Sequence, residues 1–112
     1  MKSVGYTQSL AISDTNSLVD VQLEQPIATG RDVLVKIKAI AVNPVDTKIR
    51  KNVAPQNAEH KVLGWDAVGE IVAMGENATQ FELGDVVYYA GALNRQGCNA
   101  QYQLVDERII AH

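Results

Sequence analysis

Alternating apolar and polar residues predict several short strands. In residues 17–24, Val19, Val21 and Leu23 occupy every second position, with polar residues between them. This period of two is typical of a strand with one buried face. Further strands are predicted over residues 1–6, 33–42, 67–74, 85–90 and 100–105, with turn-rich links between them and a helical turn at 106–108. The pattern predicts a mainly antiparallel small barrel or sandwich with short helices.

The longest predicted strand, residues 33–42, changes character along its length. Its polar face carries Lys36 and Lys38 and then becomes apolar at Ile40 and Val42. This change predicts that the far end of the strand passes from solvent into a covered region.

The strand is expected to end at Asn43. Pro44 has no N–H to donate to a sheet and disfavours helical conformation in the residue before it. Residues 45–51 then fit about two turns of helix, because Asp46 lies in the first turn and basic residues near the end, an order that suits the helix dipole. Residues 52–61 are predicted as a loop.

Composition narrows the class of protein. The 112 residues suit one domain with one core, and 46% apolar with 21% charged residues is ordinary for a soluble globular protein. A net charge of -3 and 5% aromatic residues give neither a basic surface nor a base-stacking platform for nucleic acid. No apolar stretch of signal-peptide or membrane-span length occurs, so a cytoplasmic location is expected.

The glycines do not form a phosphate-binding loop. Gly64, Gly69 and Gly75 match neither GxGxxG nor GxxxxGK[ST]. They are interpreted as turn and bulge residues, and Gly69, inside a predicted strand, indicates a bulge or a close backbone approach.

Metal binding and nucleophilic catalysis have little support. A zinc site usually takes three or four Cys, His or carboxylate ligands, whereas the thiol and imidazole groups here are Cys98, His60 and His112, in distant segments. No metal site is therefore predicted. A single cysteine also excludes an intramolecular disulfide, and Cys98 is interpreted as a small, partly buried residue.

Two polar spots lie where predicted strands begin or end. One contains Asn43, Asp46, Thr47 and Lys48, and the other is Gly64-Trp65-Asp66. A structural interpretation suffices for the first, since Asn before Pro favours a turn and Asp favours a first helical turn. The only tryptophan, however, is expected to cover an apolar surface. A role in an active site and a purely structural role both remain open.

Three stretches together resemble a known family. They are DVLVKIKAIAVNPVDTKIR (32–50), VLGWDAVGEIVAMGENATQFELGDVVYYAG (62–91) and CNAQYQLVDERII (98–110). The chain resembles the N-terminal, chaperonin-10-like (GroES-like) catalytic domain of the medium-chain dehydrogenase/reductase superfamily. Within the superfamily it is most similar to zinc-independent quinone oxidoreductases and to proteins labelled zinc-binding alcohol dehydrogenase-like.

The resemblance includes the loss of zinc ligands. Asn43 stands where zinc-dependent members have a Cys ligand, and Val45 where they have a proton-relay hydroxyl. Trp65-Asp66 replaces their His-Glu pair, and the Cys-rich structural zinc lobe is absent. The resemblance therefore implies chemistry without zinc.

The implied activity is hydride transfer from NADPH, or NADH, to a quinone, enone or related carbonyl substrate. Asn43 and Asp46 would be the catalytic residues, with Asp46 supporting the strand-to-helix junction. Asn43, Thr47 and Lys48 would contact the cofactor. The substrate pocket would be formed by Trp65, Asp66 and Tyr89.

The resemblance also sets the expected domain organisation. Residues 1–112 correspond to the N-terminal part of the GroES-like catalytic domain, and the Rossmann cofactor domain is expected beyond residue 112. This chain alone is then expected to be inactive, since the cofactor is bound mainly by the missing domain, and the protein is expected to be a homo-oligomer. A non-enzymatic GroES-like interaction module remains an alternative, and a zinc-dependent alcohol dehydrogenase fragment a weaker one.

Overall fold

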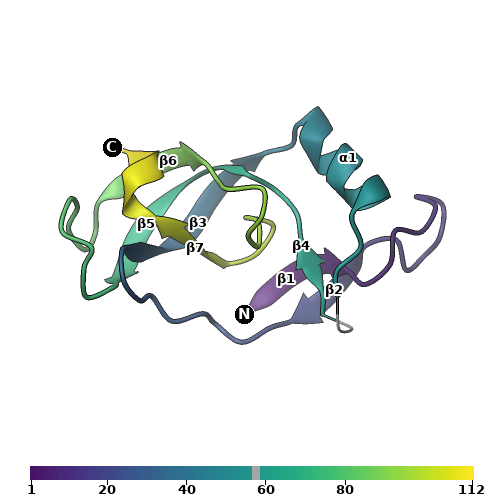
Figure 1. The fold of residues 1–112 in the computed structure, drawn as a ribbon, viewed down its shortest axis with the longest axis horizontal. Helices are drawn as coiled ribbons and strands as arrows, with labels where there is room; N and C mark the ends of the chain where they lie inside the picture. Colours follow the sequence, from purple (N-terminus) through teal and green to yellow (C-terminus); the bar gives the residue numbers. More distant parts are fainter. Residues whose placement is uncertain (57–58) are drawn as a thin grey trace.

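The structure, a computed structural model, describes residues 1–56 and 59–112. It consists of two antiparallel sheets, one α-helix and one 3-10 turn (Figure 1). In chain order the elements are β1 (Lys2–Tyr6), β2 (Val19–Gln22), β3 (Asp32–Ala41), α1 (Pro44–Asn52), β4 (Lys61–Val62), β5 (Asp66–Met74), β6 (Val86–Ala90), β7 (Tyr102–Asp106), η1 (Glu107–Ile109) and β8 (Ile110–Ala111).

The larger sheet forms most of the molecule. Its five strands have the order β7-β3-β5-β6-β8, and the sheet curls into a half-barrel (Figure 1). A smaller sheet has the order β2-β1-β4, and α1 lies beyond the end of the half-barrel, on the side of this smaller sheet. The prediction of a small, mainly antiparallel β structure with short helices is confirmed.

Two apolar clusters hold these parts together. The main core lies inside the half-barrel and includes Val33, Val35, Ile71 and Val87, all fully buried. A smaller cluster of Tyr6, Leu63 and Trp65 packs against Val45 and Ile49 of α1. The second cluster fixes the helix, and with it the strand-to-helix junction, relative to the smaller sheet.

β3 departs from the simple alternation that the sequence predicted. Its register against β5 shifts between Leu34 and Val35 and again between Ile37 and Ala39. Such bulges rotate the strand, so the two-residue period does not hold along its whole length. The close-approach interpretation of Gly69 is confirmed, since a Cβ there would lie 2.3 Å from the carbonyl oxygen of Lys36.

The far end of β3 is exposed, which corrects the prediction that it enters a covered region. Ile40 is 44% exposed and Val42 is 72% exposed. β7 pairs with β3 only from Asp32 to Lys36, whereas β5 continues to Ala41. The far end therefore lacks the cover that β7 gives the near end.

The remaining boundaries agree closely, but two strands of two residues each, β4 and β8, were not predicted. α1 begins at Pro44, one residue before the predicted start, and ends at Asn52. The prediction of a loop over residues 52–61 is wrong at both ends, because Asn52 still belongs to α1, and Lys61 starts β4 and pairs with Tyr6 of β1. A two-residue strand is too short to show periodicity, and positions 57 and 58 of the predicted loop lie outside the described residues.

Across residues 1–56 and 59–112, no helix has both the length and the apolar character that a membrane crossing would need.

Candidate functional site

Asn43 is the first residue of the site, at the point where β3 gives way to α1. It has extended backbone angles (φ -126, ψ 163) and serves as the N-cap of the helix, while Pro44 occupies the first turn, where its missing N–H costs nothing. The half-buried side-chain amide donates from Nδ2 to Oδ2 of Asp66 at 2.6 Å. The two polar spots of the sequence are thus brought into direct contact.

Asp46 lies buried beneath the same junction. Only 4% of it is exposed, and its Oδ2 accepts a hydrogen bond of 3.3 Å from the backbone N–H of Asn43. Its Oδ1 has no hydrogen-bond partner among the described residues. A buried carboxylate with one unpaired oxygen is costly, so the junction is not optimised for stability alone.

Cys98 also belongs to this cluster, which the sequence did not reveal. The thiol is 1% exposed and its Sγ donates to the carbonyl oxygen of Asp66 at 3.6 Å. Burial raises the pKa of Cys98 to about 11, and the negative charges of Asp46 and Asp66 add to this rise. Cys98 is therefore a protonated, unreactive thiol at neutral pH. It was predicted to be small and partly buried, and the structure buries it fully.

A close crossing of two chain segments places Cys98 there. The N–H of Cys98 donates to the carbonyl of Gly64 at 2.8 Å, and a Cβ on Gly64 would lie 2.8 Å from the Cys98 Sγ. Gly64 also has φ +98, in the left-handed region that favours glycine. Spacing along the chain gives no signal of such a crossing, because the two segments are far apart in sequence.

Trp65 packs under α1 and not against the open side of the site. Its ring is 3% exposed and lies in the smaller apolar cluster with Tyr6, while its Nε1 donates to the carbonyl of Ala92 at 2.9 Å. The Tyr6 hydroxyl donates to the carbonyl of Val53 at 2.5 Å, just after the last turn of the helix. The expectation that Trp65 covers an apolar surface is confirmed, and that surface is one side of α1.

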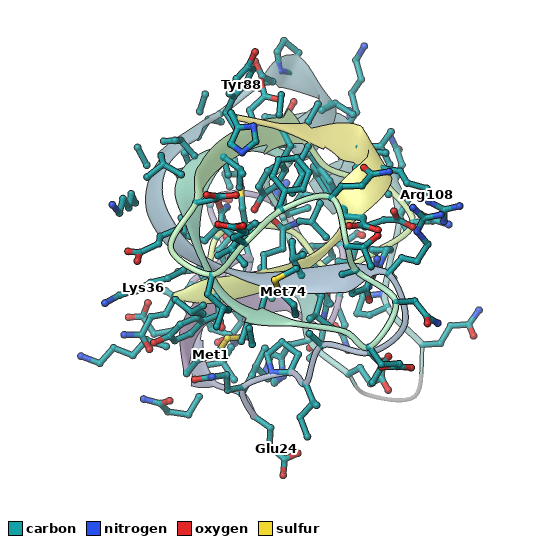
Figure 2. The ribbon with its side chains drawn as sticks, turned by 90° about the vertical axis from the view of Figure 1, so that its left-hand side faces the viewer. Met1, Glu24, Lys36, Met74, Tyr88 and Arg108 are labelled. Carbon is teal, nitrogen blue, oxygen red and sulfur yellow. The ribbon has the colours of Figure 1, made fainter. Side chains whose placement is uncertain are left out.

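An open cavity of about 750 Å³ lies next to Asp66. It extends over the exposed end of β3 and the edge of β6 to η1 and β8, and its lining includes small side chains such as Ala39 and Ala67. Tyr88 and Arg108 border it, and Figure 2 shows both in the upper half of the view, with Glu24 at the bottom.

Tyr89 lines this cavity, but its hydroxyl turns into the core. It donates to Oε1 of Gln103 at 2.8 Å, and burial raises the pKa of Tyr89 far above its usual range. The phenol therefore offers the cavity an apolar ring and no titratable group.

Thr47 and Lys48 lie apart from the polar cluster. Both are exposed on α1, and the Thr47 hydroxyl donates to the carbonyl of Pro44 at 2.8 Å, a bond within the helix. The structure therefore brings Asn43, Asp46 and Asp66 together, with Tyr89 near them, and leaves Thr47 and Lys48 on the outer surface.

The ligand set does not fit a zinc ion. Within residues 1–56 and 59–112, no three His, Cys, Asp or Glu side chains come together in a way that could hold a metal. The cluster instead offers an amide, Asn43, whose nitrogen is a poor ligand for zinc.

These features place the chain in a class and then in a family. A curled antiparallel half-barrel that carries a polar strand-to-helix junction at its open end defines a GroES-like β domain. Residues 29–111 match the family described as the Alcohol dehydrogenase GroES-like domain. The chain belongs to this family.

Relatives extend the likeness to the whole chain. A zinc-type alcohol dehydrogenase-like protein of Staphylococcus aureus is 45% identical over 111 residues, which are 99% of this chain and 32% of that protein. A crystal structure described as a proposed zinc-dependent alcohol dehydrogenase of Rhizobium etli is 46% identical, with a TM-score of 0.95 over 100% of this chain and 32% of the other.

A mycobacterial structure solved with NADPH is also similar. It is 26% identical, with a TM-score of 0.81, and the match covers 99% of this chain and 33% of the mycobacterial one. This chain thus spans about a third of the length of the proteins that it matches.

Proposed function

We propose that this chain supplies the substrate-facing part of an NAD(P)H-dependent oxidoreductase that reduces a quinone, an enone or a related carbonyl compound without a metal ion. The observation that supports the proposal most is the Asn43 amide, which Asp66 holds beside an open cavity where zinc-dependent enzymes of the superfamily have a metal ligand. An amide can hydrogen-bond to a carbonyl oxygen that a metal would otherwise polarise.

A reduced nicotinamide would supply the hydride when bound, and NADPH is present in the similar mycobacterial structure. The residues of this chain suit only the nicotinamide end of such a cofactor. The cavity of about 750 Å³ beside Asp66 leaves room for a ring, whereas none of the glycines matches a phosphate-binding loop for the diphosphate. In this proposal a Rossmann domain outside residues 1–112 binds most of the cofactor.

In this proposal, each of the predicted site residues has a defined role. Asn43 hydrogen-bonds to the bound ligand, and Asp46 holds the backbone N–H of Asn43 at the start of α1. Asp66 and Tyr89 border the substrate, and Trp65 contributes indirectly by anchoring the helix. Thr47 and Lys48, exposed on α1, face the cofactor in this arrangement.

A zinc-dependent alcohol dehydrogenase is the second candidate, because relatives carry that description. The absence of a fitting ligand set in the described part of the chain argues against it. A cytoplasmic homo-oligomer remains part of our proposal and rests on the sequence alone.

The test uses the protein at the full length of its relatives. NADPH oxidation with a quinone is expected to persist after exhaustive chelation, and Asn43→Ala is expected to lower kcat about a hundredfold, as loss of one charge-stabilising donor does. The variant should lose about 1–3 kcal/mol of stability, because the hydrogen bond from Asn43 to the Asp66 carboxylate is missing.

Asn52→Ala, at the exposed end of α1, is the matched control and should keep full turnover. Loss of activity on chelation would refute the metal-free reaction. An unchanged rate in Asn43→Ala would reduce Asn43 to a structural residue.

A further inference from the structure

We infer that Asp66 is a positioning residue that fixes the orientation of the Asn43 amide, so that Asn43 offers a hydrogen-bond donor, and not an acceptor, to the bound ligand. The inference rests on the proposed function and specifies it further. The site would then select ligands that present a carbonyl or quinone oxygen next to Asn43.

The carboxylate decides which end of the amide faces it. An ionised carboxylate only accepts hydrogen bonds, so the Asn43 nitrogen and not its oxygen must face Asp66. The short distance of 2.6 Å between Nδ2 of Asn43 and Oδ2 of Asp66 is typical of a charge-assisted bond.

The start of α1 favours the same orientation. The Asn43 side chain and the Asp46 backbone N–H form one half of a capping box, whose other half is the bond from the Asn43 N–H to the Asp46 carboxylate. The first half is not a side-chain hydrogen bond, because the Asp46 N–H donates to the backbone carbonyl of Asn43 at 3.0 Å. The arrangement still places the amide oxygen on the side of the helix N-terminus, where the dipole attracts it. The oxygen is thus turned away from Asp66 and toward the helix.

The remaining polar group is the second N–H of the Asn43 amide. It has no acceptor among the described residues, and the side chain is half-buried, so this N–H is left for a ligand bound next to Asp66, which lines the cavity. Negative charge from Asp66 and Asp46 lies on either side. This arrangement suits a neutral oxygen acceptor and disfavours a carboxylate ligand.

Asp66 is held firmly enough to impose this orientation. As the first residue of β5, it pairs with Ala41 of β3 and with Ala90 of β6. Its carbonyl also accepts from the buried Cys98 thiol. The backbone of Asp66 is therefore fixed on both sides, whereas Asn43 lies at the end of a strand paired on one side only.

The test exchanges the two side chains. Asn43→Asp places two carboxylates in contact and removes the donor, so it should lower both thermal stability and kcat/KM. The double variant Asn43→Asp/Asp66→Asn restores a hydrogen bond with reversed polarity. Its thermal midpoint should return close to the wild-type value, while kcat/KM with NADPH and 1,4-benzoquinone stays about a hundredfold low in the full-length protein. Recovery of kcat/KM together with stability would overturn the proposal.

Asp66→Asn alone should fold, because an amide can also accept from Asn43. It no longer dictates one orientation, so kcat/KM should fall roughly twofold to tenfold, in proportion to the lost productive population. Asp66→Glu, which keeps an acceptor-only group, should recover part of this loss.

A second readout does not depend on activity. In NMR spectra of the 112-residue chain, the signals of the two Asn43 Nδ2 protons should be well separated, because only one of the two protons donates to Asp66. In Asp66→Asn this separation of the two signals should become smaller. Asn43 side-chain signals that are the same in the wild type and in Asp66→Asn would refute the positioning role. An inactive full-length enzyme with the expected signals would refute only the proposed function.

Discussion

The two ends of β3 differ in what surrounds them. At the near end, Val33 and Val35 are fully buried, and neighbouring strands pair with β3 on both sides. At the far end, β5 is the only partner strand among the described residues, and Ala39 to Ala41 are exposed. The near end contributes to the stability of the core, and the far end borders the candidate site. One strand can thus serve both purposes because its pairing changes midway.

The largest difference between the ends should appear on truncating a large side chain. Ile71, which pairs with Val35 at the near end, is fully buried, so Ile71→Ala should cost about 2–5 kcal/mol of unfolding free energy. Ile40→Ala, its matched control at the exposed end, should cost about 0.5 kcal/mol. Urea unfolding followed by circular dichroism measures both. Equal losses would mean that the far end is also part of the core.

A smaller effect is expected at the bulge between the two ends. A Cβ on Gly69 would lie 2.3 Å from the Lys36 carbonyl oxygen and 2.5 Å from Cγ1 of Val35, so Gly69→Ala should cost about 1–3 kcal/mol through overpacking. The separation of the strands should show as altered backbone chemical shifts at Lys36 and Ile37. A variant as stable as the wild type would show that β3 and β5 can move apart without penalty.

The smallest effect should be seen only in acid. Glu107 is fully buried near the start of β3, and its pKa lies below the ordinary value of 4.5, chiefly because the Gln80 N–H donates to it, with Arg31 adding to the effect. A lowered pKa contributes stability that is present above pH 4.5 and is lost as the pH falls through the folded-state value.

Glu107→Gln should therefore flatten the decline of thermal stability below pH 4.5. Part of the decline of thermal stability with falling pH should remain, because the pKa values of Glu76, Asp85 and Asp106 are also lowered. A profile identical to the wild type would show that the ion pair between Arg31 and Glu107 has no net effect.

Much of the fold follows from local patterns in the sequence. The helix after Asn43 was predictable because Pro44, Asp46 and the basic end of the segment all favour it. The alternation of Val19 and Val21 was enough to locate β2. The bulges of β3 were not predictable, since they depend on how β5 packs against it and not on the residues of β3 alone.

The candidate site was predictable in part. The sequence pointed to Asn43, Asp46 and Asp66, and these residues do meet. It could not indicate that the Trp65 ring turns under α1 or that Cys98 lies against Asp66. Both result from contacts between segments that are distant in the sequence, and periodicity carries no information about such contacts.

One-sided pairing at the end of β3 also bears on how such a domain can diversify. The last hydrogen bond on the open side joins the N–H of Ile37 to the carbonyl of Gln101, so substitutions between Ala39 and Val42 leave the ladder with β7 intact. New chemistry can arise at those positions by sequence drift while the interior is inherited unchanged.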